Sequence, residues 1–228
     1  MTLKRILNNE MTAIIFDCDG VLVDSEVLAL EIERTSLAEI GLQFDLKSYQ
    51  KRHLGTTSAE FFREIEKDYQ AKFHEPLPSG FRQNIRERFR EAFSKDIPLM
   101  PSVHETLAAF HVPLAVASGS SPGALVDKLH RAGLSGFFGN HVYSSHQVEF
   151  GKPAPDIFLF AAGSLGVNPG DCTVIEDSAK GVRAAIAAGM RAIGFIGGSH
   201  CGPRHGESLL EAGAEQIVEH MAYLNDAL

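Results

Sequence analysis

The sequence lacks the features that would assign it to several large classes of protein. No segment of the 228 residues approaches the roughly 20 consecutive apolar residues of a membrane span, and no apolar signal-peptide segment follows the polar residues 1–10. The three cysteines, Cys18, Cys172 and Cys201, are odd in number and show no CxxC spacing, which argues against a disulfide framework or a zinc site. We therefore expect a protein of the reducing cytoplasm with no membrane partner.

The chain also lacks an excess of positive charge. Its formal net charge is −8 at pH 7, so its overall field would repel nucleic acid. A local basic site for a small phosphorylated molecule is compatible with that charge. Hydrophobic residues make up 44% and charged residues 22%, as in an ordinary folded protein, and the length suits a core domain that carries a smaller insertion.

Short apolar segments alternate with amphipathic segments over most of the chain. The apolar segments predict buried strands at residues 12–16, 113–118, 142–144, 172–176, 191–196 and 216–218. Helical patterns lie between them at residues 102–110, 123–132, 156–165, 178–188 and 207–212. This alternation indicates an α/β fold with a Rossmann-like, doubly wound parallel sheet, which binds ligands outside the carboxyl ends of its strands.

One long segment interrupts this alternation. Residues 27–94 contain no convincing strand. Helical patterns occupy residues 28–40, 58–73 and 81–93. We therefore predict an all-helical cap domain at 27–94, inserted into a core domain that residues 1–26 and 95–228 form together.

Two aspartates follow the first predicted strand directly, in the order Asp17-Cys18-Asp19-Gly20. Side chains alternate in extended backbone, so we expect Asp17 and Asp19 on the same side. Two carboxylates at a buried strand end repel each other and need a cation or a shared proton, and Gly20 allows a sharp turn after them. The pair suits a nucleophile, Asp17, beside an acid–base partner, Asp19. A polar turn at the strand end is the simpler alternative.

A second acidic pair, Glu176-Asp177, ends another predicted strand. If the two strands are neighbours, these acids face Asp17 and Asp19 across the strand ends. A cluster that offers only oxygen ligands suits Mg²⁺. Capping of the next helix by Asp177 or Ser178 would explain the pair without a metal, but two acidic strand ends in one chain favour the metal site.

Two further segments could recognise phosphate. Ser118, Gly119 and Ser120 precede a helix, where hydroxyls and backbone N–H groups can bind phosphate oxygens, although an ordinary serine-rich loop would look the same. Lys152 is followed by two prolines, Pro153 and Pro155, which stiffen the backbone beside this cation; a solvated surface lysine is the alternative. The histidines are scattered without metal-ligand spacing, so we expect most of them at the surface or in loops.

Together these four segments resemble the haloacid dehalogenase superfamily of phosphatases and phosphomutases over nearly the whole chain. Residues 16–26, FDCDGVLVDSE, are similar to its first motif almost residue by residue. Ser118 stands at the second motif, Lys152 in GKPAPDIF at the third, and the second acidic pair at the fourth. The helical insertion resembles the mobile cap of the branch that includes β-phosphoglucomutase and phosphoglycolate phosphatase.

The resemblance implies three catalytic residues. Asp17 would attack phosphorus and form an aspartyl-phosphate, and Asp19 would protonate the leaving oxygen and then activate water. Lys152 would stabilise the charge of the transition state. The implied enzyme is a Mg²⁺-dependent phosphoric monoester hydrolase for a small phosphorylated metabolite, such as a sugar phosphate or 6-phosphogluconate, and we expect a monomer or a weak dimer.

The resemblance also implies the residues that bind metal and substrate. The Mg²⁺ ligands would be Asp17, the backbone carbonyl of Asp19, Asp177, and Glu176 either directly or through water. The phosphate ligands would be the Ser118 hydroxyl and the N–H groups of Gly119 and Ser120. The loop Gly55-Thr56-Thr57 falls where the caps of this family place a substrate contact.

The sequence leaves three alternatives to a phosphatase to consider. A sugar phosphomutase of the β-phosphoglucomutase type has a similar cap, but such enzymes usually carry histidine where this chain has Ala29. They also tend to carry Lys-Asn where this chain has Ser121-Pro122, so a phosphatase is favoured. Dehalogenase members lack the second aspartate, which is present here as Asp19. A non-catalytic binding protein with this fold would be expected to have lost part of the motifs, and all of them are intact.

Overall fold

The computed structural model describes residues 13–53, 58–93 and 97–228, so the predicted substrate contacts Gly55 and Thr56 lie outside it. A six-stranded parallel sheet forms its centre, in the order β3-β2-β1-β4-β5-β6. The strands are β1 (Ala13–Phe16), β2 (Leu114–Ser118), β3 (Val142–Ser144), β4 (Cys172–Glu176), β5 (Arg191–Phe195) and β6 (Gln216–Val218). All six lie where the apolar segments predict them, and the parallel α/β fold is confirmed.

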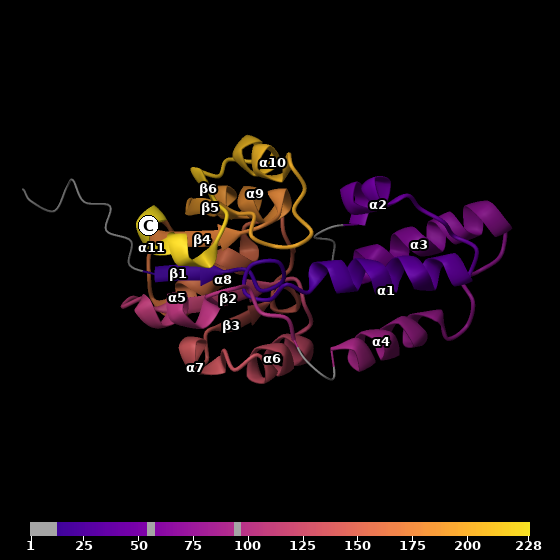
Figure 1. The fold of residues 1–228 in the computed structure, drawn as a ribbon, viewed down its shortest axis with the longest axis horizontal. Coiled ribbons are helices and arrows are strands. Elements are labelled where there is room, and N and C mark those ends of the chain that lie inside the picture. Colours follow the sequence, from indigo (N-terminus) through magenta and orange to yellow (C-terminus); the bar gives the residue numbers. More distant parts are fainter. Residues whose placement is uncertain (1–12, 54–57, 94–96) are drawn as a thin grey trace, which may run out of the picture.

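Helices cover both faces of the sheet because its strands are apolar on both sides (Figure 1). Ile14 and Phe16 of β1 belong to one hydrophobic core, and Ala13 and Ile15 belong to the other. The first core is covered by α5 (Val103–Ala109), α6 (Pro122–Arg131), α7 (Ser135–Phe138) and α11 (Leu224–Ala227). The second is covered by α8 (Asp156–Leu165), α9 (Ala179–Ala187) and α10 (His205–Glu211). Short 3₁₀ turns occupy Ser145–Gln147, Pro169–Asp171 and Met221–Tyr223.

Four helices form a separate group beside the sheet (Figure 1). They are α1 (Glu26–Glu39), α2 (Leu46–His53), α3 (Ser58–Phe73) and α4 (Phe81–Ala92). Their apolar faces meet in a third core around Leu37, Tyr49, Ile65 and Ile85. The sequence predicts three of them and misses α2. Among the described residues, no helix combines the length and the apolarity that a bilayer crossing requires.

The chain crosses twice between the sheet and the four helices, and the two crossings are bonded to each other. The Asp24 N–H donates to the Pro98 carbonyl at 2.8 Å, and the Met100 N–H donates to the Leu22 carbonyl at 3.1 Å. An antiparallel bridge lies between these two hydrogen bonds. The division into a core domain of residues 1–26 and 95–228 and an inserted cap at 27–94 stays a prediction.

Candidate active site

The carboxyl ends of neighbouring strands bring the predicted site residues to one edge of the sheet. Phe16, the last residue of β1, pairs in register with Val116 of β2 and Ile175 of β4. Asp17 follows immediately, and its N–H donates to the Ile175 carbonyl at 2.9 Å. Because β2 and β4 flank β1 on opposite sides, Asp17 lies where the strand order reverses and where such sheets bind ligands.

Lys152 joins the ends of three strands. Its Nζ donates to Asp17 Oδ1 at 2.6 Å, to Glu176 Oε2 at 2.7 Å and to the Ala117 carbonyl at 2.9 Å. The lysine side chain is only 10% exposed. The sequence left open whether this lysine is solvated. The structure places it directly against the candidate nucleophile.

Asp17, Glu176 and Asp177 form a buried group of carboxylates whose ligand atoms lie within 4.8 Å of one another. Carboxylate oxygens are the ligands that Mg²⁺ prefers. One lysine cannot neutralise three carboxylates, so a divalent cation would balance the remaining charge. These residues fit the ion that the family resemblance implies, and a further contact from the Asp19 carbonyl stays a prediction.

Burial controls the protonation of these groups. Burial raises the pKa of Asp17 well above its ordinary value, Lys152 lowers it, and Glu176 and Asp177 raise it again. Burial and the Glu176 charge likewise raise the pKa of Asp177. Burial alone would lower the pKa of Lys152, but Asp17 and Glu176 raise it above its ordinary value, so the lysine stays protonated. A cation beside Asp17 would therefore favour its ionised, nucleophilic form.

Asp19 has partners of its own. Lys128 forms an ion pair with its carboxylate, Ser25 Oγ donates to Oδ1 at 2.5 Å, and Ser120 Oγ donates to Oδ2 at 3.0 Å. Burial alone would raise the pKa of Asp19, but the Lys128 charge and the three hydrogen-bond donors lower it below its ordinary value. Asp19 is therefore ionised in this structure, and each aspartate of the first motif pairs with a different lysine.

Lys128 is a site residue that the sequence motifs did not indicate. It lies on α6, three residues after the buried Leu125 and next to the buried Leu129, and so on the inward face of that helix. Burial alone would lower the pKa of Lys128, but Asp19 raises it above its ordinary value. A lysine at a core position, on the helix that follows the serine loop, was the signal available in the sequence.

The serine loop at the end of β2 (Ser118, Gly119 and Ser120) contains an internal hydrogen bond. Ser118 is 1% exposed, and its Oγ accepts the Ser120 N–H at 3.1 Å. Ser144, at the end of β3, donates its hydroxyl to the Ser120 carbonyl at 2.6 Å. Phosphate binding by the Ser120 N–H would require that Ser118 release it. Gly119 has open space around its Cβ position, and the phosphate contacts of all three residues stay a prediction.

The turn after Asp19 packs directly against Asp177. Gly20 has a φ of 81°, and a Cβ there would lie 1.9 Å from Asp177 Oδ2, so a side chain would displace this carboxylate. His200 Nε2 lies 3.0 Å from the same Oδ2, and His205 Nε2 donates to the Asp177 carbonyl at 2.5 Å. His200 is 6% exposed, because its loop folds back over the strand ends.

The chain is similar to known proteins over most of its length. A family model described as a haloacid dehalogenase-like hydrolase matches residues 11–189. The phosphorylated carbohydrates phosphatase of Thermotoga maritima is 32% identical over 218 residues, which cover 94% of this chain and 97% of that protein. The 6-phosphogluconate phosphatase of Escherichia coli is 24% identical over 195 residues, which cover 86% and 87% of the two chains.

A solved structure shows the same fold over the same length. The crystal structure of a haloacid dehalogenase family hydrolase from Deinococcus radiodurans, with bound phosphate and sodium, matches with a TM-score of 0.78. It is 33% identical, and the match covers 96% of each chain. The curated relatives are named as phosphatases, which agrees with a phosphoric monoester hydrolase. The chain belongs to the haloacid dehalogenase-like hydrolase family.

Proposed function

We propose that the chain is a Mg²⁺-dependent phosphatase that hydrolyses a sugar phosphate or sugar-acid phosphate through an aspartyl-phosphate on Asp17. The observation that carries the proposal is the buried contact of 2.6 Å between Lys152 Nζ and Asp17 Oδ1, within a group of three carboxylates. An anionic nucleophile can approach an anionic phosphate only where cations offset the repulsion. The named activities of the relatives support the substrate class.

In the first step, a carboxylate oxygen of Asp17 would attack phosphorus while the bond from phosphorus to the ester oxygen breaks. Lys152, which already contacts Asp17, would stabilise the negative charge that develops on the phosphoryl group. Mg²⁺, held by Asp17, Asp177 and Glu176, would supply further electrostatic stabilisation when bound. The departing ester oxygen needs a proton from a group on the opposite side of phosphorus.

We assign the transfer of this proton to Asp19. The structure supports the second half of the reaction, because the ionised Asp19 beside Lys128 can accept a proton from water. That water would attack phosphorus, release inorganic phosphate and restore the Asp17 carboxylate. Donation to the leaving oxygen in the first half needs the protonated acid. Asp19 must therefore separate from Lys128 before the ester bond breaks.

Two residues separate this proposal from a phosphomutase. Ala29, where mutases of this branch usually carry histidine, lies on α1 and has no polar group. Pro122 begins α6 and has neither a side-chain donor nor a backbone N–H. A mutase must retain a bisphosphorylated intermediate and return its phosphoryl group, so a loss of polar contacts at both positions favours transfer to water.

The test is the hydrolysis of p-nitrophenyl phosphate in the presence of Mg²⁺. Asp17→Asn should reduce turnover by about a thousandfold or more, because the amide cannot form the phosphoenzyme. Asp127→Asn is the matched control, because Asp127 is exposed on α6 and its side chain is 64% accessible. Undiminished turnover in Asp17→Asn would remove the nucleophile assignment.

Two further measurements refine the proposal. Acid quenching during turnover, followed by peptide mass spectrometry, should find one phosphoryl group on the peptide that contains Asp17. A panel of phosphorylated sugars and sugar acids, including 6-phosphogluconate, should identify a substrate hydrolysed faster than p-nitrophenyl phosphate. Interconversion of β-glucose 1-phosphate and glucose 6-phosphate that depends on glucose 1,6-bisphosphate would instead establish the mutase.

A further inference from the structure

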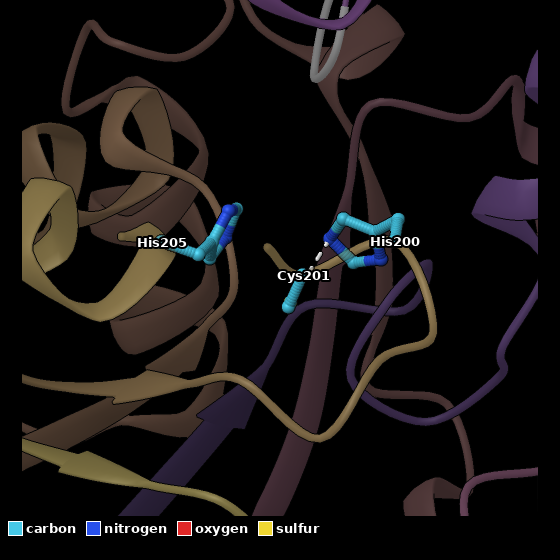
Figure 2. Close-up of side chains that lie close together, drawn as sticks. All are labelled: His200, Cys201 and His205. Atoms are coloured by element: carbon cyan, nitrogen blue, oxygen red, sulfur yellow. Dashed lines mark hydrogen bonds between the residues drawn. The ribbon is translucent and has the colours of Figure 1, made fainter. Parts of the chain in front are cut away.

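A second group of potential metal ligands lies on the loop between β5 and the start of α10. His200, Cys201 and His205 each direct one ligand atom toward the others, and these three atoms lie within 4.8 Å of one another. Figure 2 shows Cys201 between the two imidazole rings. The spacing of these residues in the sequence matches no zinc motif, and only the folding of the loop brings them together.

One distance within the group matches tetrahedral coordination. The distance from Cys201 Sγ to His200 Nε2 is 3.4 Å, and the same nitrogen lies 3.0 Å from Asp177 Oδ2, a contact that a bound metal ion would replace. Two ligands of a tetrahedral zinc ion, with Zn–S near 2.3 Å and Zn–N near 2.0 Å, are separated by about 3.5 Å. His205 uses its Nε2–H to bond the Asp177 carbonyl, which leaves the lone pair of Nδ1 for a ligand. Such a hydrogen bond on the second ring nitrogen is the usual way in which proteins orient a metal-binding histidine.

The surroundings favour a cation and leave it a path from solvent. The Asp177 carboxylate, whose Oδ2 lies 3.0 Å from His200 Nε2, adds negative charge beside the group. Cys201 and His205 are both partly exposed. His200 is the buried member, and its Nδ1 has no hydrogen-bond partner among the described residues. The neighbouring residues therefore bury the His200 ring but leave its Nδ1 without a hydrogen bond.

We propose that His200, Cys201 and His205 bind one transition-metal ion of the Zn²⁺ type, with water in the fourth position. The donor set of two imidazole nitrogens and one thiolate suits Zn²⁺, Co²⁺ or Ni²⁺, whereas the three carboxylates around Asp17 suit Mg²⁺. The thiol proton of Cys201 is released to solvent when the metal–sulfur bond forms. The chain therefore carries one site that prefers Mg²⁺ and one that prefers Zn²⁺-type ions. Asp177 belongs to the first site and contacts His200 of the second.

Co²⁺ is the probe that tests this site, because a bound thiolate gives cobalt a charge-transfer absorption that oxygen ligands do not. The whole chain, in excess Mg²⁺, should bind one Co²⁺ with this absorption, and Zn²⁺ should displace it. Cys201→Ala should abolish the absorption and weaken Zn²⁺ binding at least about tenfold. Cys172→Ala, which removes a buried thiol on β4, should leave both unchanged.

Two further variants separate this site from the Mg²⁺ site and from a folding defect. Asp17→Asn should keep the cobalt absorption, because Asp17 belongs only to the carboxylate group. His205→Ala should weaken Zn²⁺ binding while the circular dichroism spectrum stays that of the unmodified chain. The proposal is overturned if the unmodified chain shows no thiolate-to-cobalt absorption, if Cys201→Ala retains it, or if Asp17→Asn removes it.

Discussion

Ion pairs between a basic side chain and a carboxylate occur both at the strand ends and on the inserted helices. The first are buried and the second are exposed to solvent. At the strand ends, Lys152 pairs with Asp17 and Glu176, and none of these three side chains is more than 11% exposed. On the inserted helices, Arg82 pairs with Glu66 at 2.6 Å, and the two side chains are 52% and 48% exposed. The distances are similar, so the contrast lies in the solvent around the pairs.

The comparison distinguishes buried charges, which serve the reaction, from exposed charges, which serve solubility. Taking ions out of water costs free energy that a buried pair often fails to recover, whereas an exposed pair costs and contributes little. A fold selected for stability alone would have no reason to bury Lys152 among carboxylates. The difference therefore indicates that the strand ends are arranged for reactivity, and three substitutions test it.

The largest effect on stability is expected from Lys152→Met. Asp17 and Glu176 would remain buried without their cation, so the free energy of unfolding without added metal should fall by about 3 to 5 kcal/mol near neutral pH. The loss should shrink as the pH falls, because protonation removes the unpaired charges. Urea unfolding at several pH values measures it.

The control for this variant is Lys67→Met, which makes the same exchange at an exposed position of α3. Its free energy of unfolding should stay within about 0.5 kcal/mol of that of the unmodified chain. Equal losses in Lys152→Met and Lys67→Met would show that the buried lysine is not needed to hold the carboxylates together.

A smaller effect is expected from Lys128→Met. Without the lysine charge the pKa of Asp19 should rise, because burial then dominates. Asp19 acts as an acid in the step that kcat/KM reports, so the alkaline limb of the kcat/KM profile should move to higher pH, and the rate at its maximum should fall about tenfold to a hundredfold. An unchanged alkaline limb would mean that Asp19 does not govern the pH dependence.

The same variant changes the dependence of stability on pH. The pKa of Asp19 in the folded chain lies below its ordinary value, so this group stabilises the fold above its ordinary pKa. The contribution disappears as the pH falls through the lowered pKa. In Lys128→Met it should be missing near neutral pH, while the two chains should converge in acid.

The smallest effect is expected from Glu66→Gln on α3. The substitution removes an exposed ion pair and leaves Arg82 over the Phe62 ring, 5.3 Å from its centroid. The free energy of unfolding should change by about 1 kcal/mol or less, and salt should reduce the difference further. A loss comparable to that of Lys152→Met would erase the distinction between the two regions.

The elements that the sequence predicts well are those with a strong local pattern. Each strand is a short apolar segment, and the acids at residues 17, 19, 176 and 177 follow two of them directly. Parallel strands end at the same edge of a sheet, so the position of these acids follows from the fold class alone. The helix α2 was missed because it is short and mostly polar.

The residues that the sequence does not indicate depend on contacts between distant segments. Lys128 reaches Asp19 because α6 packs on the same face of the sheet as the loop after β1. His200 reaches Asp177 because the loop after β5 folds back over β4. The inward position of Lys128 on its helix was a usable signal, and the position of His200 had none.

The bonded pair of chain crossings has a mechanical consequence. Because Asp24 is tied to Pro98 and Met100 to Leu22, the two connecting strands act as one attachment instead of two independent tethers. Sliding of the four helices along the sheet edge would break these hydrogen bonds, whereas swinging about the paired strands would keep them. The fold thereby favours rotation about the paired crossings over sliding of one part along the other.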